Sequence, residues 1–172
     1  LLWMRQNGLE AKILRYASEG GIVFGICGGY QMLGAEISDP EGVEQKGTVR
    51  GMGLLPVRTR FTMEKRRTRI QGHFLELRGI LKDLSGMEFE GYADITEAEN
   101  ISGAGRLRPD GAQRGNVYGC YVHGIFDAPG CAEGFISALL KRKGYDPSQI
   151  QARDWKAYKE EQYDRLADII RE

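Results

Sequence analysis

The chain has 172 residues, of which 41% are hydrophobic and 28% are charged, an ordinary balance for one globular domain with a substantial core. Its 24 acidic and 24 basic residues cancel to a formal net charge of zero, which argues against a nucleic-acid-binding or membrane-surface protein. No apolar segment reaches the length of a membrane helix and no signal peptide is evident, so the sequence favours a cytoplasmic protein.

The elements predicted from the sequence alternate between helix and strand along the chain. Helices are expected at residues 5–17, 28–37, 131–143 and 154–171. Strands are expected at residues 21–26, 54–61, 68–77, 89–95 and 116–122. Glycine-rich connections are expected at residues 38–51 and 102–115. This order predicts an α/β fold in which a mainly parallel sheet is flanked by helices and interrupted by a strand-rich insertion.

The stretch "GGIVFGICGGYQMLG", residues 20–34, holds a cysteine between glycines at the junction of two predicted elements. Ile22–Ile26 is short, apolar and bounded by glycine, as is typical of a buried strand. Good helix formers follow from Tyr30 onwards. Gly28 and Gly29 therefore mark a sharp turn, where we expect them both to adopt torsions that a Cβ would forbid and to let another group approach the main chain closely.

Cys27 at this turn has two interpretations. It is a small buried residue in a glycine-rich turn, or it is an exposed nucleophile at a helix N-terminus, where free N–H groups favour the thiolate. The second arrangement is the thiol version of a nucleophile elbow. The pattern GxCxGxQ, formed by Gly25, Cys27, Gly29 and Gln31, favours the nucleophile.

The chain has two histidines, and their surroundings differ. His73 lies in an alternating polar and apolar segment, which favours a structural or solvated role. His123 follows the predicted strand at 116–122, and ligands of α/β sheets bind beyond the carboxyl ends of the strands. We therefore expect His123 beside Cys27, a pair that could hydrolyse an amide through a thioester, with the N–H of Gly28 as an oxyanion donor.

Three cysteines without metal-like spacing predict neither a metal site nor a disulfide framework. Cys120 lies inside a predicted strand and is expected in the core. Cys131 is expected to pack inward at the start of a helix.

The segments "GICGGYQMLG" and "GNVYGCYVHGIFD" resemble the glutaminase domains of the cobyric acid synthase family, which are class I glutamine amidotransferases of the cobalamin pathway. "LLWMRQNGLEAKI", "RGMGLLPVRTRF" and "KEEQYDRLADIIRE" extend the resemblance over nearly the whole chain. The resemblance implies a flavodoxin-like amidotransferase fold with glutamine as substrate. It assigns Cys27 as nucleophile, His123 as base, and Gln31 and Gly28 as substrate-binding residues.

The same resemblance implies a partner. Ammonia would pass to a separate synthetase domain that uses ATP and magnesium to amidate side-chain carboxylates of a corrinoid, while the glutaminase domain itself needs no cofactor and no metal. The chain begins at Leu1 without a counterpart of the family's first strand or of the loop that supplies a second oxyanion donor. We therefore expect residues 1–172 to form a single amidotransferase domain that is truncated at its N-terminus and lacks the synthetase domain.

Two positions depart from the pattern of class I amidotransferases. Ile125 stands where many of them carry a glutamate two residues after the histidine, which leaves a dyad. Asp127 is then either an orienting carboxylate or a solvated loop residue. In "FEGYADITEAEN", Tyr92 fits the family, but Thr96 and Glu97 replace an expected histidine and glycine.

Two other functions stay open. One is the glutaminase domain of a related amidotransferase, either a cobyrinate diamide synthase or an enzyme that amidates a cell-wall precursor. The other is a catalytically silent docking domain, for which the altered segment from Tyr92 to Glu97 is the argument.

Overall fold

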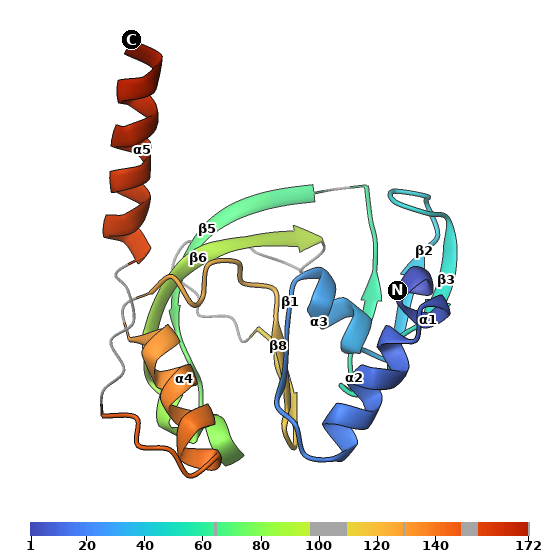
Figure 1. Ribbon diagram of the computed structural model, residues 1–172. Helices are drawn as coiled ribbons and strands as arrows, with labels where there is room; N and C mark the ends of the chain where they lie inside the picture. The colour runs from blue at the N-terminus through green and yellow to red at the C-terminus, as the bar shows by residue number, and fades with distance from the viewer. Residues whose placement is uncertain (64, 97–109, 129, 149–154, 172) are drawn as a thin grey trace. The chain divides into compact units, whose positions relative to one another are not determined.

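A computed structural model describes residues 1–63, 65–96, 110–128, 130–148 and 155–171 (Figure 1). The chain forms two compact units. The first comprises Leu1–Ile70 and Tyr92–His123, and the second comprises Gln71–Gly91 and Gly124–Glu172.

The helices and strands follow one another closely along the described chain. The helices are α1 (Leu2–Gln6), α2 (Leu9–Ser18), α3 (Gly28–Leu33), the 3-10 helix η1 (Gly79–Leu84), α4 (Cys131–Arg142) and α5 (Trp155–Arg171). The strands are β1 (Val23–Ile26), β2 (Glu36–Asp39), β3 (Gly47–Arg50), β4 (Arg58–Arg60), β5 (Lys65–His73), β6 (Glu88–Thr96), β7 (Ala112–Arg114) and β8 (Val117–Cys120). Within the described ranges, none of these helices is long and apolar enough to cross a membrane.

The described strands form three small sheets rather than one mainly parallel sheet. The first has the order β1-β8-β7, in which β1 and β8 are parallel and β7 is antiparallel to β8. The second has the order β3-β2-β4, in which β2 is antiparallel to β3 and parallel to β4. Strands β5 and β6 form a two-stranded ribbon. The α/β class is confirmed, whereas the flavodoxin-like arrangement stays a prediction.

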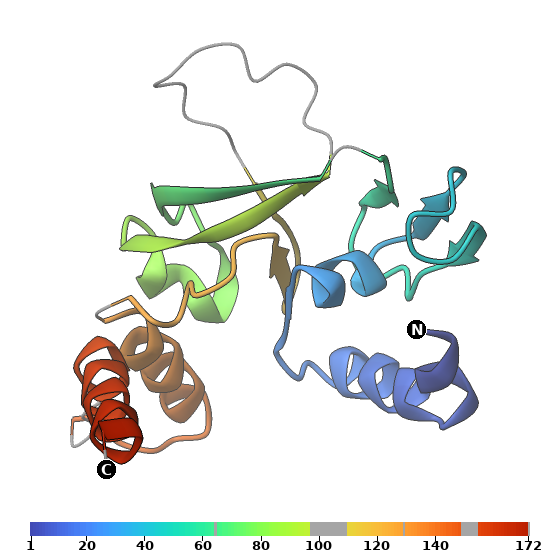
Figure 2. The same ribbon diagram turned by 90° about the horizontal axis from the view of Figure 1, so that it is seen from above.

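Two of the predicted helices differ from expectation at a glycine: the first is divided, and the second is shorter. The helix expected at 5–17 is divided at Gly8, which has a φ of 73°, and the chain turns there between α1 and α2 (Figure 2). The helix expected at 28–37 ends before Gly34, where an added Cβ would lie 2.7 Å from the carbonyl oxygen of Val57. The N–H of Ala35 donates to that same oxygen at 2.8 Å, so pairing with a distant segment replaces the helix and β2 begins.

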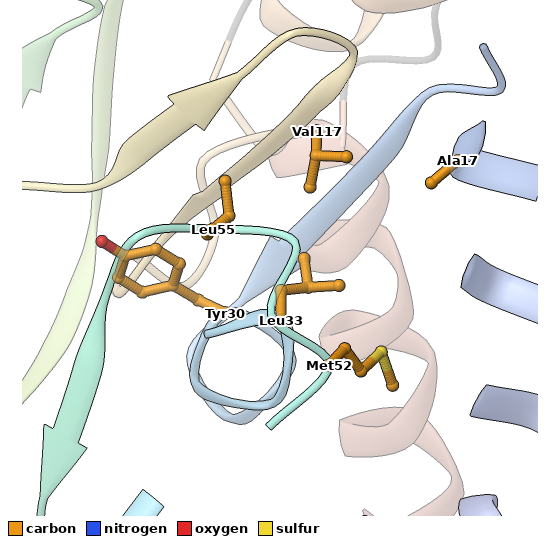
Figure 3. Packing of buried hydrophobic residues seen from close by; sticks show 6 residues of the cluster. All are labelled: Ala17, Tyr30, Leu33, Met52, Leu55 and Val117. Atoms are coloured by element: carbon orange, nitrogen blue, oxygen red, sulfur yellow. The ribbon is translucent and has the colours of Figure 1, made fainter. Parts of the chain in front are cut away.

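The core of the first unit is built from α2, α3, β8 and the segment between β3 and β4. Its buried members are Ala17, Tyr30, Leu33, Met52, Leu55 and Val117 (Figure 3). Tyr30 and Leu33 both come from α3, so this short helix is fixed by the burial of two large side chains. Each such side chain contributes about 1.5–3 kcal/mol when it is removed from water.

In the second unit, α4 packs against η1. Leu84 of η1 is fully buried, and an added Cβ at Gly134 of α4 would lie 2.6 Å from its Cδ2 atom. Helix α5 exposes most of its large hydrophobic side chains. Its large exposed hydrophobic residues are Trp155, Tyr163, Leu166, Ile169 and Ile170.

Candidate active site

Cys27 occupies the single residue between β1 and α3, and its backbone is strained. Its φ and ψ are 49° and −111°, which makes it the one non-glycine residue with positive φ in the described parts of the chain. L-amino acids avoid this region because of steric repulsion from Cβ, and such strain is concentrated at functional sites. A strained residue between strand and helix is the geometry of a nucleophile elbow. The Cys27 thiol is free and partly exposed.

Gly25 makes this sharp turn possible. An added Cβ at Gly25 would lie 2.6 Å from Cδ1 of Leu33 and 2.8 Å from the backbone nitrogen of Tyr30. Helix α3 therefore folds back directly onto the strand that precedes it. The close packing of α3 on β1 explains why glycine stands at position 25, two residues before Cys27.

Gly28 and Gly29 behave differently from the prediction. Neither has a positive φ, so the expectation of unusual torsions at these two glycines is wrong, and Cys27 itself carries the strain. An added Cβ would meet no atom within 4 Å at either position. Their lack of a side chain leaves room beside Cys27, which a bound substrate could use.

Cys27 and His123 follow the carboxyl ends of two adjacent parallel strands. Strand β1 pairs with β8 in a register that ends with Ile26 opposite Cys120. The pairing continues one residue further, because the N–H of Cys27 donates to the carbonyl oxygen of Cys120 at 2.9 Å. His123 comes three residues after the end of β8 and is exposed. The sequence predicted this placement at the end of neighbouring strands; the catalytic roles stay predictions.

Gln31 and Gly28 both lie on α3, close to Cys27 along the chain. The N–H of Gln31 donates to the carbonyl oxygen of Cys27 at 3.0 Å, which puts Gln31 one helical turn after the nucleophile and on the same side of the helix. Gly28 is the first residue of α3. The first N–H groups of a helix have no partner within it, so the Gly28 N–H is suited to an oxyanion.

Two aromatic side chains pack beside the two strand ends. Tyr30 of α3 lies directly on the backbone of β8, since an added Cβ at Gly119 would be 2.3 Å from the tyrosine ring. The ring of Tyr121 meets that of Tyr30 edge-on, with centroids 5.1 Å apart. The hydroxyl of Tyr121 is 3.3 Å from Oγ1 of Thr59. These contacts hold Tyr121, the residue that follows β8 and leads to His123.

Asp110, which no pattern in the sequence singled out, is bonded to the residue after β8. Its Oδ2 atom accepts a 2.8 Å hydrogen bond from the N–H of Tyr121. Loss of hydration raises the pKa of the Asp110 carboxyl, while the N–H groups of Tyr121 and Gly111 oppose this effect. Burial and then the nearby Asp110 carboxylate raise the pKa of Tyr30. The Asp-Gly pair at 110–111 signals a turn, but nothing in the sequence identifies its partner.

The two other cysteines are free and buried, and their surroundings disfavour the thiolate. Burial raises the pKa of the Cys120 thiol to about 12. Burial likewise raises the pKa of Cys131, whose Sγ atom lies 3.5 Å from the carbonyl oxygen of Glu88. Since the thiolate is the nucleophile, these environments favour the partly exposed Cys27 over Cys120 and Cys131 as a nucleophile.

The remaining predicted residues belong to the second unit, to β6 or to the part of the chain that the structure does not describe. Asp127 belongs to the second unit, where its Oδ2 accepts a 2.7 Å hydrogen bond from Nζ of Lys159. The Asp127 carboxylate is thus paired with Lys159, and its predicted role in orienting His123 stays a prediction. His73 is exposed on β5. Tyr92 and Thr96 lie in β6, and Glu97 falls outside the described residues.

No group of three or more His, Cys, Asp or Glu side chains within the described ranges is placed to hold a metal ion. The chemistry that the cluster offers is that of a partly exposed thiol, an imidazole, a side-chain amide and helix N–H groups. These are the parts needed to attack and hydrolyse an amide through a thioester.

Comparison with known proteins identifies similar sequences. Residues 1–130 match the family described as the CobB/CobQ-like glutamine amidotransferase domain. The whole chain is 45% identical to 36% of the length of a cobyric acid synthase from Ruminiclostridium cellulolyticum. It is 40% identical to a cobyric acid synthase from Lachnoclostridium phytofermentans, over 99% of the chain and 37% of that protein. A probable cobyric acid synthase from Thermococcus kodakarensis is 37% identical, over 100% of the chain and 36% of that protein. The chain thus spans little more than a third of the length of these relatives.

Proposed function

The chain belongs to the family of CobB/CobQ-like glutamine amidotransferase domains, and on that basis we propose that it hydrolyses glutamine at Cys27. The observation that carries the proposal is the backbone of Cys27, with a φ of 49° between β1 and α3. A strained turn of this kind presents a nucleophile in front of helix N–H groups. A cysteine that served only the core would have no need of the strain.

In the proposed reaction, the Cys27 thiol first loses its proton to His123. The thiolate sulfur attacks the side-chain carbonyl carbon of glutamine, and the oxyanion that forms is stabilised by the N–H of Gly28. His123 returns the proton to the amide nitrogen, the C–N bond breaks and ammonia leaves. A cysteinyl thioester remains.

The second half of the reaction releases glutamate. His123 takes a proton from a water molecule, which attacks the thioester carbonyl carbon. The C–S bond breaks, the sulfur recovers a proton and the Cys27 thiol is restored. Gln31, one helical turn after Cys27, is proposed to hold the glutamine by hydrogen bonds. The open space at Gly28 and Gly29 is where the substrate would approach α3.

Within a longer protein, the ammonia would serve an amidation. The relatives named cobyric acid synthase are nearly three times as long as the chain, which covers 36–37% of them. We propose a synthetase portion as partner, which binds ATP and magnesium and amidates side-chain carboxylates of a corrinoid in cobalamin biosynthesis. The names of these relatives and their 37–45% identity support this assignment.

The test is the release of glutamate and ammonia from glutamine, measured with and without hydroxylamine. Hydroxylamine traps a thioester as the γ-glutamyl hydroxamate, so formation of this product would report the intermediate directly. Cys27→Ser should abolish both the turnover and the hydroxamate. Cys131→Ser, which alters a buried thiol of the second unit, is the matched control and should keep both. A folded chain that forms neither glutamate nor hydroxamate would contradict the proposal.

A further inference from the structure

One peptide group at the end of β8 is held from both sides. Its carbonyl oxygen, that of Cys120, accepts the N–H of Cys27 at 2.9 Å. Its N–H, that of Tyr121, donates to Oδ2 of Asp110 at 2.8 Å. The backbone of Cys27 and the carboxylate of Asp110 therefore both hydrogen-bond to the Cys120–Tyr121 peptide group, and Tyr121 is two residues before His123.

The side chain of Asp110 replaces a strand at this position. Strand β7 pairs with β8 in an antiparallel register that includes Ala112 opposite Gly119. Continued in the same direction, this register would put residue 110 opposite Tyr121. At Gly111 the chain turns instead, with a φ of 88°. The Tyr121 N–H, which would face a backbone carbonyl in a longer β7, is bonded by the Asp110 carboxylate.

Gly111 permits this arrangement by a close approach. An added Cβ at Gly111 would lie 2.5 Å from the carbonyl oxygen of Gly119 and 3.3 Å from Cβ of Cys120. Both its positive φ and its contact with β8 exclude a side chain. The Asp110-Gly111 pair is thus built to bring one carboxylate to the end of the strand that leads to His123.

We propose that Asp110 is a positioning residue for the glutaminase reaction, because it fixes the Cys120–Tyr121 peptide to which the Cys27 backbone is bonded and from which the chain runs to His123. This inference rests on the proposed function. Asp110 acts through the backbone and does not touch the substrate. Its role needs an oxygen acceptor at the end of a short side chain, so asparagine can replace aspartate and alanine cannot.

The test compares Asp110→Ala with Asp110→Asn in glutamine hydrolysis. Misplacement of a catalytic group by about 1 Å costs up to roughly 100-fold in rate, so Asp110→Ala should lower kcat by ~10- to 100-fold while KM changes by less than about threefold. Asp110→Asn should keep kcat within about threefold of the wild type. An equally low kcat in Asp110→Asn, or an unchanged kcat in Asp110→Ala, would overturn the proposal.

Asp146→Ala is the matched control. The Asp146 carboxylate also accepts a backbone N–H, that of Ser148 at 2.9 Å, but it lies in the second unit. The Asp146→Ala substitution should leave kcat unchanged. If Asp110→Ala does not fold, Asp110→Asn alone decides the question. The proposal is then wrong if Asp110→Asn folds and protects the Tyr121 amide from exchange but has a kcat lowered more than tenfold.

Two further measurements separate this inference from the proposed function. Amide hydrogen exchange at Cys27 and Tyr121 should be faster in Asp110→Ala than in the wild type, and modification of Cys27 by iodoacetamide should change in rate. A wild-type chain without glutamine turnover would refute the proposed function. Equal exchange and equal iodoacetamide rates in wild type and Asp110→Ala would instead refute the positioning role.

Discussion

The N–H of Cys27 donates a 2.9 Å hydrogen bond to the carbonyl oxygen of Cys120. This bond extends the parallel pairing of β1 and β8 one residue beyond β1, into the strained residue itself. The position of Cys27 is therefore tied to the strand that leads to His123, although 96 residues of sequence separate the two side chains. The parallel pairing of β1 and β8, and not closeness along the chain, puts Cys27 and His123 after neighbouring strand ends.

The three thiols should differ sharply in reactivity. Iodoacetamide at pH 8 should modify Cys27, while Cys120 and Cys131 stay unmodified in the folded chain. With a pKa of about 12, Cys120 has only about one thiolate in 10⁴ at pH 8, and burial raises the pKa of Cys131 as well. Peptide mapping by mass spectrometry checks this, and denaturation should make all three react. Comparable modification of Cys131 and Cys27 in the folded chain would contradict the assignment.

His123 should matter for rate and little for stability. Because its side chain is exposed, His123→Asn should leave the melting temperature unchanged. As loss of a general acid–base group, it should lower glutamine hydrolysis by about 10²- to 10⁴-fold. His73→Asn is the matched control, since His73 is also exposed but lies on β5, and its activity should equal that of the wild type. Equal activity of the two variants would remove His123 from the mechanism.

Gly25 and Gly29 should respond in opposite ways to alanine. Gly25→Ala places a Cβ 2.8 Å from the backbone nitrogen of Tyr30, so it should lower the free energy of unfolding by about 1–3 kcal/mol. Gly29→Ala meets no atom within 4 Å and should leave that free energy unchanged or raise it by up to about 1 kcal/mol, as alanine is the better helix former. Urea unfolding measures both. Equal stability of the two variants would contradict the described packing of α3 on β1.

The loop after β2 should depend on the ionised form of Asp39. The buried Asp39 carboxylate accepts the N–H groups of residues 42–45 at 2.8–2.9 Å. Burial by itself raises the pKa of Asp39, but these four hydrogen bonds outweigh it and hold the pKa below the ordinary 3.8. A lowered pKa in the folded state stabilises the fold above pH 3.8, and this stabilisation is lost as the pH falls through the folded pKa.

Asp39→Ala should accordingly speed amide hydrogen exchange at residues 42–45 at neutral pH and weaken the loss of stability in acid. Glu41→Gln is the control, because Glu41 is exposed in the same loop, and its exchange should match the wild type. Unchanged exchange in Asp39→Ala would show that the carboxylate does not organise this loop.

Local signals made part of this structure predictable. The apolar run ending at Ile26 forms β1, and the strand predicted at 116–122 forms as β8, which ends two residues earlier at Cys120. Their parallel pairing follows from the expectation that two strand ends in an α/β fold meet at one edge. The Cys27 elbow could be located in the same way, because strand, glycine and helix formers follow one another within a few residues.

Other features depend on contacts between distant segments and have no local signal. Glu36–Asp39 form a strand although helix formers precede them, because the segment around Val57 supplies the partner of Ala35. Strand β7 was expected to be part of a connection, and its three residues are too few for a recognisable pattern. The bond between Asp110 and Tyr121 needs a turn at Gly111 that lies against Gly119, which no spacing in the sequence shows.

Reaction of the purified chain with a chloroketone derived from glutamine, followed by peptide mapping, tests directly whether Cys27 is the nucleophile of a glutamine site. We expect a single adduct on Cys27, which forms more slowly in excess glutamine and is absent in Cys27→Ser. An adduct shared with Cys120 or Cys131 in the folded chain, an adduct that glutamine does not slow, or the absence of any adduct on Cys27 would contradict the claim that Cys27 is the nucleophile of a glutamine site.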